Sequence, residues 1–162
     1  MGVFVDITPL RKFPQFRRLW IGYVISLLGS QITIVAVAYQ IYRMTGSSLD
    51  VGLISLVQLG PALIGSLLGG PLADAMDRRR LLIITQVVMA VSSVGLALNA
   101  ISHHPAIWPI YVLAAITAGA NGCDSPTRMA LMITLVDRES LAAASSIRQL
   151  LQQLSYIVGP VV

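Results

Sequence analysis

Residues 81–123 read LLIITQVVMAVSSVGLALNAISHHPAIWPIYVLAAITAGANGC, which is 43 consecutive positions without Asp, Glu, Lys or Arg. One crossing of a lipid bilayer takes about 20 apolar residues. This stretch is therefore long enough for two spans, with the turn between them near Pro105. Outward from it, the uncharged runs at 51–73 and 19–42 each match a single span. The sequence predicts an all-α transmembrane protein with several spans.

The composition excludes several other classes of protein. Only 11% of the residues are charged and 56% are hydrophobic, whereas a soluble domain carries about 25% charged residues. A soluble enzyme, a disordered tail and a secreted disulfide scaffold are therefore excluded, the last also because Cys123 is the single cysteine. The sequence shows no metal-ligand spacing and no nucleophile–base pair. We therefore expect neither a metal site nor catalytic residues, and no enzymatic activity.

The predicted organisation is a short lead-in followed by membrane spans. Residues 1–18 form the lead-in, and residues 19–162 form part of an N-terminal transmembrane half. From Gln149 onward only 14 uncharged residues remain, fewer than one crossing needs, so we expect the chain to stop inside its last span. The expected spans are 19–42, 49–72, 81–101, 110–124 and an incomplete 141–162.

The net charge of +4 is explained by membrane topology. Ten of the 11 basic residues fall in the lead-in, the 73–80 connection and the region after residue 124, and only Arg43 falls on the opposite side. Cytoplasmic connections are enriched in Lys and Arg, so the N-terminus is predicted to be cytoplasmic. We expect the bilayer, and not a nucleic acid, to be the partner of these basic residues.

One face of the first predicted helix is polar. Its residues recur at spacings of 3 and 4, which keeps them on one side of a helix. Polar groups within a span face a partner helix or a water-filled cavity. This face, which we call the seam, therefore either packs against another helix or lines a substrate path. The seam consists of Tyr23, Ser26, Ser30, Thr33, Val37 and Gln40.

The last predicted helix also carries polar residues on one face. Arg148 and Gln152 are the candidates there for the substrate path. Arg148 has an alternative role, because a long basic side chain near the end of a span can extend to the membrane interface.

Small residues follow one face of the second and fourth predicted helices. Gly65 and Gly69 form a GxxxG step, and Gly119 and Gly122 lie on a similar surface. Small residues at these spacings let two helices approach closely. We therefore expect these two faces to serve packing.

The segment between the second and third predicted spans combines acids and bases at the membrane edge. Residues 69–80 read GGPLADAMDRRR, with two carboxylates and three guanidiniums within seven positions. Three arginines suffice as a topology anchor, but they do not explain Asp74. A carboxylate at the membrane edge is costly unless it is paired or lies at a helix N-terminus. Asp74 is therefore a candidate functional residue.

This same segment carries a family resemblance. The pattern Gly70-x-Leu72-Ala73-Asp74-x-x-x-Arg78-Arg79 resembles the cytoplasmic loop signature between helices 2 and 3 of the major facilitator superfamily. Ala75 and Asp77 stand where that signature usually has a basic residue and a glycine.

Within that superfamily, the chain is most similar to the siderophore (enterobactin) exporter branch, and the similarity extends along nearly its whole length. The segments that carry it include Pro9-Leu10-Arg11, Pro14-Gln15-Phe16-Arg17, Val51-Gly52-Leu53, Ile110-Tyr111-Val112-Leu113 and Leu135-Val136-Asp137-Arg138-Glu139-Ser140-Leu141.

The resemblance implies a fold, a mechanism and partners. The chain would be the first four helices and part of the fifth of a major-facilitator-type helical bundle. The complete carrier has two six-helix halves that rock around a central site. Export would be driven by the proton gradient across the plasma (inner) membrane, without a cofactor. The implied partners are a small-molecule substrate, the lipid bilayer and the C-terminal half of the same carrier.

The resemblance also implies a role for four residues. Gly70, Asp74, Arg78 and Arg79 would form a conformational latch loop. In it, Asp74 would cap a helix of the second half in one conformation, with Arg78 pairing nearby.

Three functions remain open at the level of sequence. The first is export of a siderophore or a similar amphipathic small molecule, the second is a multidrug-type efflux carrier, and the third is a truncated, non-transporting membrane fragment. The residue that carries protons is also open, because the only acid before Asp124 in the predicted spans is Asp50, at the start of the second span. It would be Asp74, Asp124 or a residue of the second half, unless coupling is unusual in this branch.

Overall fold

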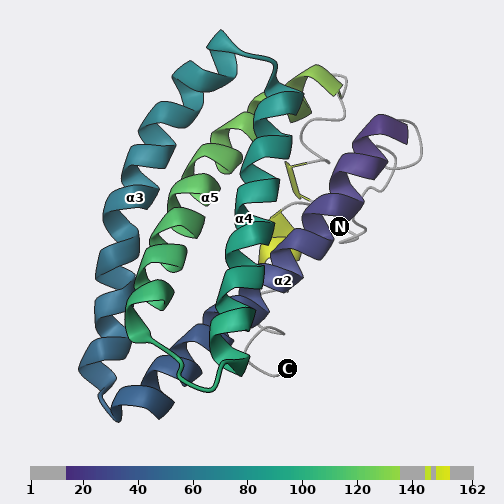
Figure 1. Cartoon of the computed structure of the whole chain (residues 1–162). Coiled ribbons are helices and arrows are strands. Elements are labelled where there is room, and N and C mark those ends of the chain that lie inside the picture. The colour runs from purple at the N-terminus through teal and green to yellow at the C-terminus, as the bar shows by residue number, and fades with distance from the viewer. Residues whose placement is uncertain (1–13, 136–144, 147–148, 154–162) are drawn as a thin grey trace. The chain divides into compact units, whose positions relative to one another are not determined.

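The computed structural model shows an all-helical protein over the residues it describes, which are 14–135, 145–146 and 149–153. Four long helices make up most of this part (Figure 1). They are α2 (Pro14–Thr45), α3 (Ser48–Ala75), α4 (Arg78–Ile101) and α5 (Ile107–Leu135). The predicted all-α class is confirmed.

The chain divides into two compact units. Residues 36–130 form one unit, which contains the end of α2, all of α3 and α4, and α5 as far as Ala130. Residues 1–35 and 131–162 form the other, whose longest described element is the first part of α2. The buried charges and the cavity of the candidate site lie within the unit 36–130.

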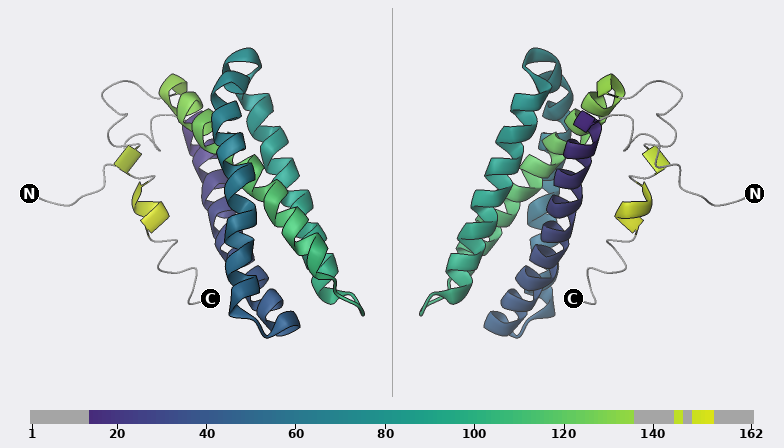
Figure 2. Two further views of the ribbon diagram at one scale, coloured as in Figure 1. Left: turned by 90° about the vertical axis from the view of Figure 1, so that its left-hand side faces the viewer. Right: turned by 90° about the vertical axis from the view of Figure 1, so that its right-hand side faces the viewer.

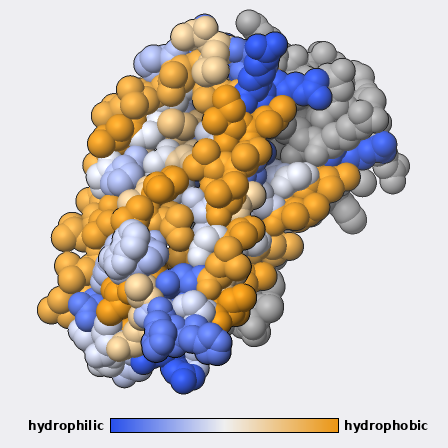
Figure 3. All heavy atoms as spheres, viewed as in Figure 1, coloured by the Kyte–Doolittle hydropathy of each residue, from blue (hydrophilic) through white to orange (hydrophobic). Residues whose placement is uncertain are grey.

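Three of the described helices have segments long and apolar enough to cross a membrane: Trp20–Thr45, Ser48–Ala75 and Arg78–Ile101. Their large apolar side chains are widely exposed, as at Leu67 and Val91. In Figure 3, hydrophobic residues spread over the middle of the visible face and hydrophilic residues gather towards its two ends. Such an apolar surface needs a bilayer around it. Charged residues interrupt the second half of α5, which is not among these three helices.

The described helix α2 begins inside the segment that the sequence predicts as a lead-in. That lead-in was expected to end at residue 18, but α2 starts at Pro14. Proline is favoured at the first helical position, because its missing N–H would have no helical partner there and its φ angle already suits a helix. The helix thus extends into the predicted lead-in, while its membrane-length segment begins at Trp20.

The helix α5 is longer than the sequence predicts. The prediction ends this helix near Asp124 and treats Pro126 as part of a connection, whereas α5 continues to Leu135. A proline removes one helical hydrogen bond and strains the preceding turn, but it does not end this helix. In the same turn, the hydroxyl of Thr127 donates to the carbonyl oxygen of Cys123 at 2.7 Å. Asp124 therefore lies inside a continuous helix.

The turn between α2 and α3 consists of Gly46 and Ser47. Gly46 has a φ of +67°, a left-handed conformation that glycine adopts without a steric penalty. The side chain of Ser47 then caps α3 by accepting a hydrogen bond from the Asp50 N–H at 3.3 Å. Ser47 is therefore the N-cap residue of α3.

The connection between α3 and α4 is shorter than the predicted loop. Only Met76 and Asp77 lie between the two helices. The Met76 N–H donates to the Leu72 carbonyl oxygen at 3.1 Å, and the Asp77 carboxylate accepts from the Arg80 N–H at 3.0 Å, which caps α4. Two such caps make a short turn sufficient. The latch residues are thus helical, with Gly70 and Asp74 in α3 and Arg78 and Arg79 in α4.

The helices α3 and α5 cross at their small residues (Figure 2). A Cβ atom on Gly65 would collide with the carbonyl oxygen of Gly119, and one on Gly69 would lie 2.9 Å from the Cys123 Cα atom. Side chains at these glycines would push the two backbones apart. The predicted packing role of these small-residue faces is confirmed for α3 and α5.

An apolar cluster lies towards the opposite end of the unit 36–130 from Asp124. It joins the end of α2 to the other three helices, and it consists of Val37, Ile41, Ile54, Leu96, Ile110 and Ala114. The hydroxyl of Tyr111 donates to the Asp50 carbonyl oxygen at 3.0 Å beside it. This cluster is the core that fixes the ends of α3, α4 and α5 near the turns.

Candidate functional site

An ion pair is buried in the second half of α5. The side chains of Asp124 and Arg128 are only 8% and 9% exposed. The Nε atom of Arg128 donates to Asp124 Oδ2 at 3.0 Å, and its Nη2 atom donates to Oδ1 at 3.1 Å. A single charge in such surroundings is expensive to desolvate, so each member of this pair depends on the other.

The neighbouring helix α4 supplies two more donors to the same carboxylate. Gln86 Nε2 lies 2.9 Å from Asp124 Oδ1, and Thr85 Oγ1 lies 3.1 Å from it. The Thr85 hydroxyl also lies 3.0 Å from the Leu82 carbonyl oxygen, so its single proton is shared between two acceptors. We call Thr85, Gln86, Asp124 and Arg128 the buried polar cluster. It attaches α4 to α5 by side-chain hydrogen bonds.

A second acid–arginine pair lies at the connection between α3 and α4. Arg78 Nη2 and Asp74 Oδ1 are 3.6 Å apart, and their side chains are 35% and 79% exposed. The Nη1 atom of Arg78 also donates to the carbonyl oxygen of Ala130 in α5, at 3.2 Å. Arg78 therefore links the connection to α5. Of the other latch residues, Arg79 is exposed and Gly70 is half-buried.

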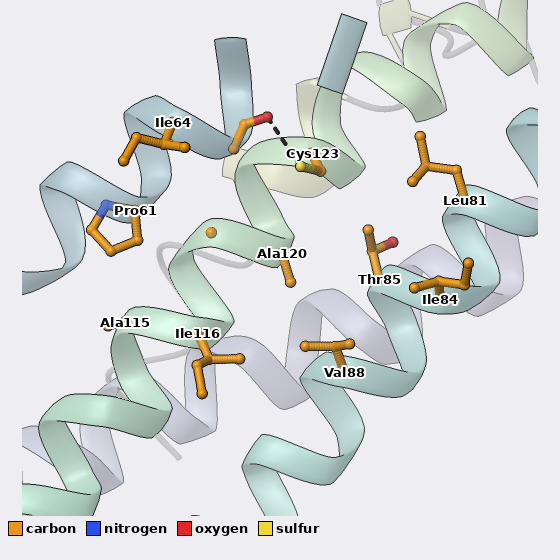
Figure 4. A pocket seen from close by; sticks show the side chains of 12 residues that line it. Pro61, Ile64, Leu81, Ile84, Thr85, Val88, Ala115, Ile116, Ala120 and Cys123 are labelled. Carbon is orange, nitrogen blue, oxygen red and sulfur yellow. Dashed lines mark hydrogen bonds between the residues drawn. The ribbon is translucent and has the colours of Figure 1, made fainter. Parts of the chain in front are cut away.

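An apolar cavity of about 530 Å³ opens between α3, α4 and α5 (Figure 4). Thr85 belongs to its wall and to the buried polar cluster, so the two features adjoin. The Cys123 thiol in the wall donates to the Gly65 carbonyl oxygen at 3.1 Å. Most of the wall is aliphatic, so the cavity suits an apolar group. Its lining includes Pro61, Ile64, Ile84, Val88, Ile116 and Ala120.

The seam residues on the first part of α2 are half-buried, including Tyr23. The Ser30 hydroxyl donates to the Ser26 carbonyl oxygen at 2.9 Å, and the Thr33 hydroxyl donates to that of Gly29 at 2.9 Å. Hydroxyls that bond to their own helix can lie in either a packed or a water-lined surface. The path role of this seam therefore stays a prediction.

The other path candidates are distributed over both units. Gln40 is half-buried on α2, and its Nε2 atom has no hydrogen-bond partner among the described residues. Gln152 is half-buried in the helical stretch 149–153. Arg148 lies outside the described residues. Of the predicted latch residues, the structure thus places Asp74 and Arg78 in contact, and it does not test the path.

Sequence reasoning did not select the buried polar cluster as a site. The predicted span ends at Asp124, so the sequence places Arg128 in a cytoplasmic connection. Basic residues are common in such connections. Two signals could have found the cluster. Asp124 and Arg128 have the spacing of helical neighbours, and Thr85-Gln86 is the polar pair in the otherwise apolar run 81–91.

Residues 19–162 match the Major Facilitator Superfamily. Because this match covers most of the chain, the protein belongs to that superfamily of membrane transporters. The apolar helices and the family together identify it as a multi-pass membrane protein.

Similar proteins of known name include the enterobactin exporters EntS of Shigella flexneri, Escherichia coli O1:K1 / APEC and Escherichia coli O139:H28 (strain E24377A / ETEC). Each is 28% identical to this chain over 158 residues, which are 98% of the chain and 38% of the relative. The chain thus spans about two fifths of the length of these relatives. The resemblance to this branch of the superfamily is confirmed. No solved structure matches the chain.

Proposed function

We propose that this chain is the N-terminal part of a secondary active carrier that exports a siderophore, or a similar amphipathic small molecule, with the energy of the proton gradient. The observation that carries the proposal is the similarity to enterobactin exporters over 98% of the chain. This similarity includes the spans as well as the latch segment, so it goes beyond the signature shared by the superfamily.

The latch is the part of the mechanism that these residues can supply. Asp74 has a largely exposed carboxylate with one long contact, to Arg78 at 3.6 Å. An exposed carboxylate at the membrane edge can form and break contacts with another helix at small desolvation cost. We infer that Asp74 caps a helix of the second half in one conformation, while Arg78 keeps the connection attached to α5.

The remaining parts of the proposal concern the path and the membrane. The seam from Tyr23 to Gln40 would line the substrate path, together with Arg148 and Gln152. The carrier would lie in the inner membrane with its N-terminus in the cytoplasm, as the distribution of basic residues favours. Its partners would be the substrate, the bilayer and a C-terminal half that completes the central site.

Export of enterobactin tests the function directly. The carrier, in its whole length, is expressed in cells that make enterobactin but lack their own exporter. We expect enterobactin to appear in the medium and to fall inside the cells, and we expect a protonophore to stop the export. The control is the same cells without the carrier.

The two other functions give different results in that assay. A multidrug-type carrier would leave enterobactin inside the cells and would instead lower the accumulation of cationic dyes. A non-transporting fragment would be present in the membrane and change neither. An open reading frame that ends at Val162 would favour this last outcome, because alternating access needs two halves.

Cysteine labelling tests the path separately. Cysteines placed at Ser26, Ser30 and Thr33 are expected to react with a charged, water-soluble thiol reagent in intact membranes. The matched control is Ile25→Cys, since Ile25 is a 67% exposed apolar residue on a different face of α2. Equal protection at all four positions would leave only the packing role for the seam.

A further inference from the structure

We propose that Thr85 and Gln86 are positioning residues that hold Asp124 in its ion pair with Arg128. The buried polar cluster is then a fixed clamp between α4 and α5, and Asp124 is not the residue that carries the transported proton. The second part rests on the proposed proton-driven export, whereas the clamp does not depend on it.

The donors around Asp124 are the first argument. Oδ1 receives hydrogen bonds from Thr85, Gln86 and Arg128, and Oδ2 receives one from Arg128. Each of these neighbours presents a hydrogen to the carboxylate, and a carboxylate can only accept. Residues of both α4 and α5 thus hold the same carboxylate, through four hydrogen bonds. The cluster therefore fixes Asp124 against Arg128 and joins the two helices.

The position of the pair on a single helix is the second argument. Asp124 and Arg128 are four residues apart in α5, so they face each other on successive turns. Rocking of one half of a carrier against the other moves helices as rigid bodies. Such a movement cannot separate this pair unless α5 itself unwinds. A carboxylate that must gain and lose a proton in each cycle would need a partner that moves away.

The surroundings of the cluster are the third argument. The adjoining cavity offers few polar groups, because of its lining residues only Thr85 and Cys123 carry a side-chain polar atom, and both are hydrogen-bonded. A proton relay needs water or a chain of titratable groups. Figure 4 shows aliphatic side chains around Thr85, such as Ile84 and Val88. On this side, the pair is shielded from a water path.

The chain contains a natural probe of the clamp. Cys123 is its single cysteine and directly precedes Asp124, and its thiol is half-buried against Gly65. If the clamp loosens, α5 separates from its neighbours more often and the thiol becomes more reactive. The rate of reaction with N-ethylmaleimide, in a carrier whose only cysteine is Cys123, therefore measures the clamp without any need for export.

Two substitutions remove the α4 donors one at a time. We expect Thr85→Val and Gln86→Met to raise the labelling rate of Cys123 by roughly three- to tenfold. Gln86→Met should have the larger effect, because the Thr85 proton is shared with Leu82. The matched control is Thr117→Val, since the Thr117 hydroxyl donates to Leu113 within α5, at 2.8 Å. Unchanged labelling in both cluster variants would overturn the clamp.

A paired substitution tests the statement about protons. Asp124→Asn alone removes the carboxylate that accepts two hydrogen bonds from the buried Arg128 guanidinium, so we expect a strong loss of the protein from the membrane. Asp124→Asn combined with Arg128→Gln removes both charges and retains hydrogen-bonding amides, so we expect the amount of protein to recover. The export that this double variant retains should still depend on the proton gradient.

The outcomes separate this inference from the proposed function. Recovered protein whose export has become independent of the gradient would show that Asp124 carries the proton, and would overturn the inference. A double variant that fails to recover would show that the amides cannot replace the ion pair. Unchanged Cys123 labelling in Thr85→Val and Gln86→Met would in that case still overturn the clamp. If the parent carrier exports no enterobactin, the proposed function fails, but the labelling of Cys123 still tests the clamp.

Discussion

Two Asp-x-x-x-Arg pairs with the same spacing lie near the same end of this bundle, and they have opposite surroundings. Asp74 and Arg78 bridge the junction of α3 and α4, with side chains 79% and 35% exposed and 3.6 Å between the charged atoms. Asp124 and Arg128 lie inside α5, with side chains 8% and 9% exposed and 2.9 Å between their nearest charged atoms. Identical spacing therefore does not imply an identical role.

The difference lies in what surrounds each pair. Thr85 and Gln86 add donors to Asp124, whereas Asp74 has Arg78 as its ion-pair partner in the described residues. A buried, fully hydrogen-bonded pair resists change, and an exposed one exchanges its partners easily. We infer that the Asp124–Arg128 pair fixes α4 and α5 together. The Asp74–Arg78 pair can engage another part of the carrier.

The largest expected effect comes from removing one member of the buried pair. Arg128→Met leaves the Asp124 carboxylate buried without its counter-ion, so we expect a loss of about 3–5 kcal/mol in the free energy of unfolding. Arg78→Met removes a partly exposed pair and one hydrogen bond, so we expect only about 1 kcal/mol. Thermal or denaturant unfolding of the purified carrier in detergent measures both losses.

Arg79→Met serves as the control for that comparison, because Arg79 is an exposed arginine at the same helix terminus. It should change the unfolding free energy by less than about 0.5 kcal/mol. Equal losses for Arg128→Met and Arg78→Met would show that burial does not distinguish the two pairs.

The next effect is on export rather than on stability. Asp74→Asn keeps the size of the side chain and removes its charge, so we expect export to be abolished while the amount and the unfolding midpoint of the carrier stay near those of the parent. Enterobactin in the medium and immunoblots of the membrane fraction provide the two readings. The matched control is Asp77→Asn, which retains a side-chain oxygen to cap α4. Normal export by the Asp74 variant would end the latch proposal.

The smallest expected effect is a difference in salt dependence. A double-mutant cycle over Asp74 and Arg78 should give a coupling of about 0.3–0.5 kcal/mol at low salt that declines when the salt is raised to about 1 M. A cycle over Asp124 and Arg128 should give a larger coupling that salt hardly changes, since the pair is shielded from solvent. Parallel salt curves for the two cycles would show that both pairs are equally accessible to ions.

Much of the fold could be predicted from sequence, because the signals are local. The uncharged run 81–123 predicts α4 and the first part of α5, and the small residues Gly65 and Gly119 predict the close crossing of α3 and α5. The difference in helix length is also local. The predicted span ends at residue 124, whereas α5 continues past Pro126 to Leu135, because proline is tolerated in a helix interior at a cost.

In the candidate site too, contacts between residues close in sequence could be predicted, and contacts between distant residues could not. The pairing of Asp74 with Arg78 could be predicted because both belong to a contiguous signature. The buried polar cluster could not be assembled, since Gln86 and Asp124 are 38 positions apart in the sequence and meet only through the packing of α4 on α5. A carboxylate at the predicted end of a span can reach water. The same carboxylate buried inside a helix needs a partner for its charge.

Gradient-driven transport into inside-out membrane vesicles tests the contrast between the two pairs most directly. The vesicles carry the parent, the Asp74→Asn variant or the double variant Asp124→Asn with Arg128→Gln, and the uptake of enterobactin is measured with and without an imposed proton gradient. The account predicts gradient-dependent uptake by the parent and by the double variant, and none by the Asp74 variant. Gradient-dependent uptake by the Asp74 variant, with none by an equally abundant double variant, would contradict it.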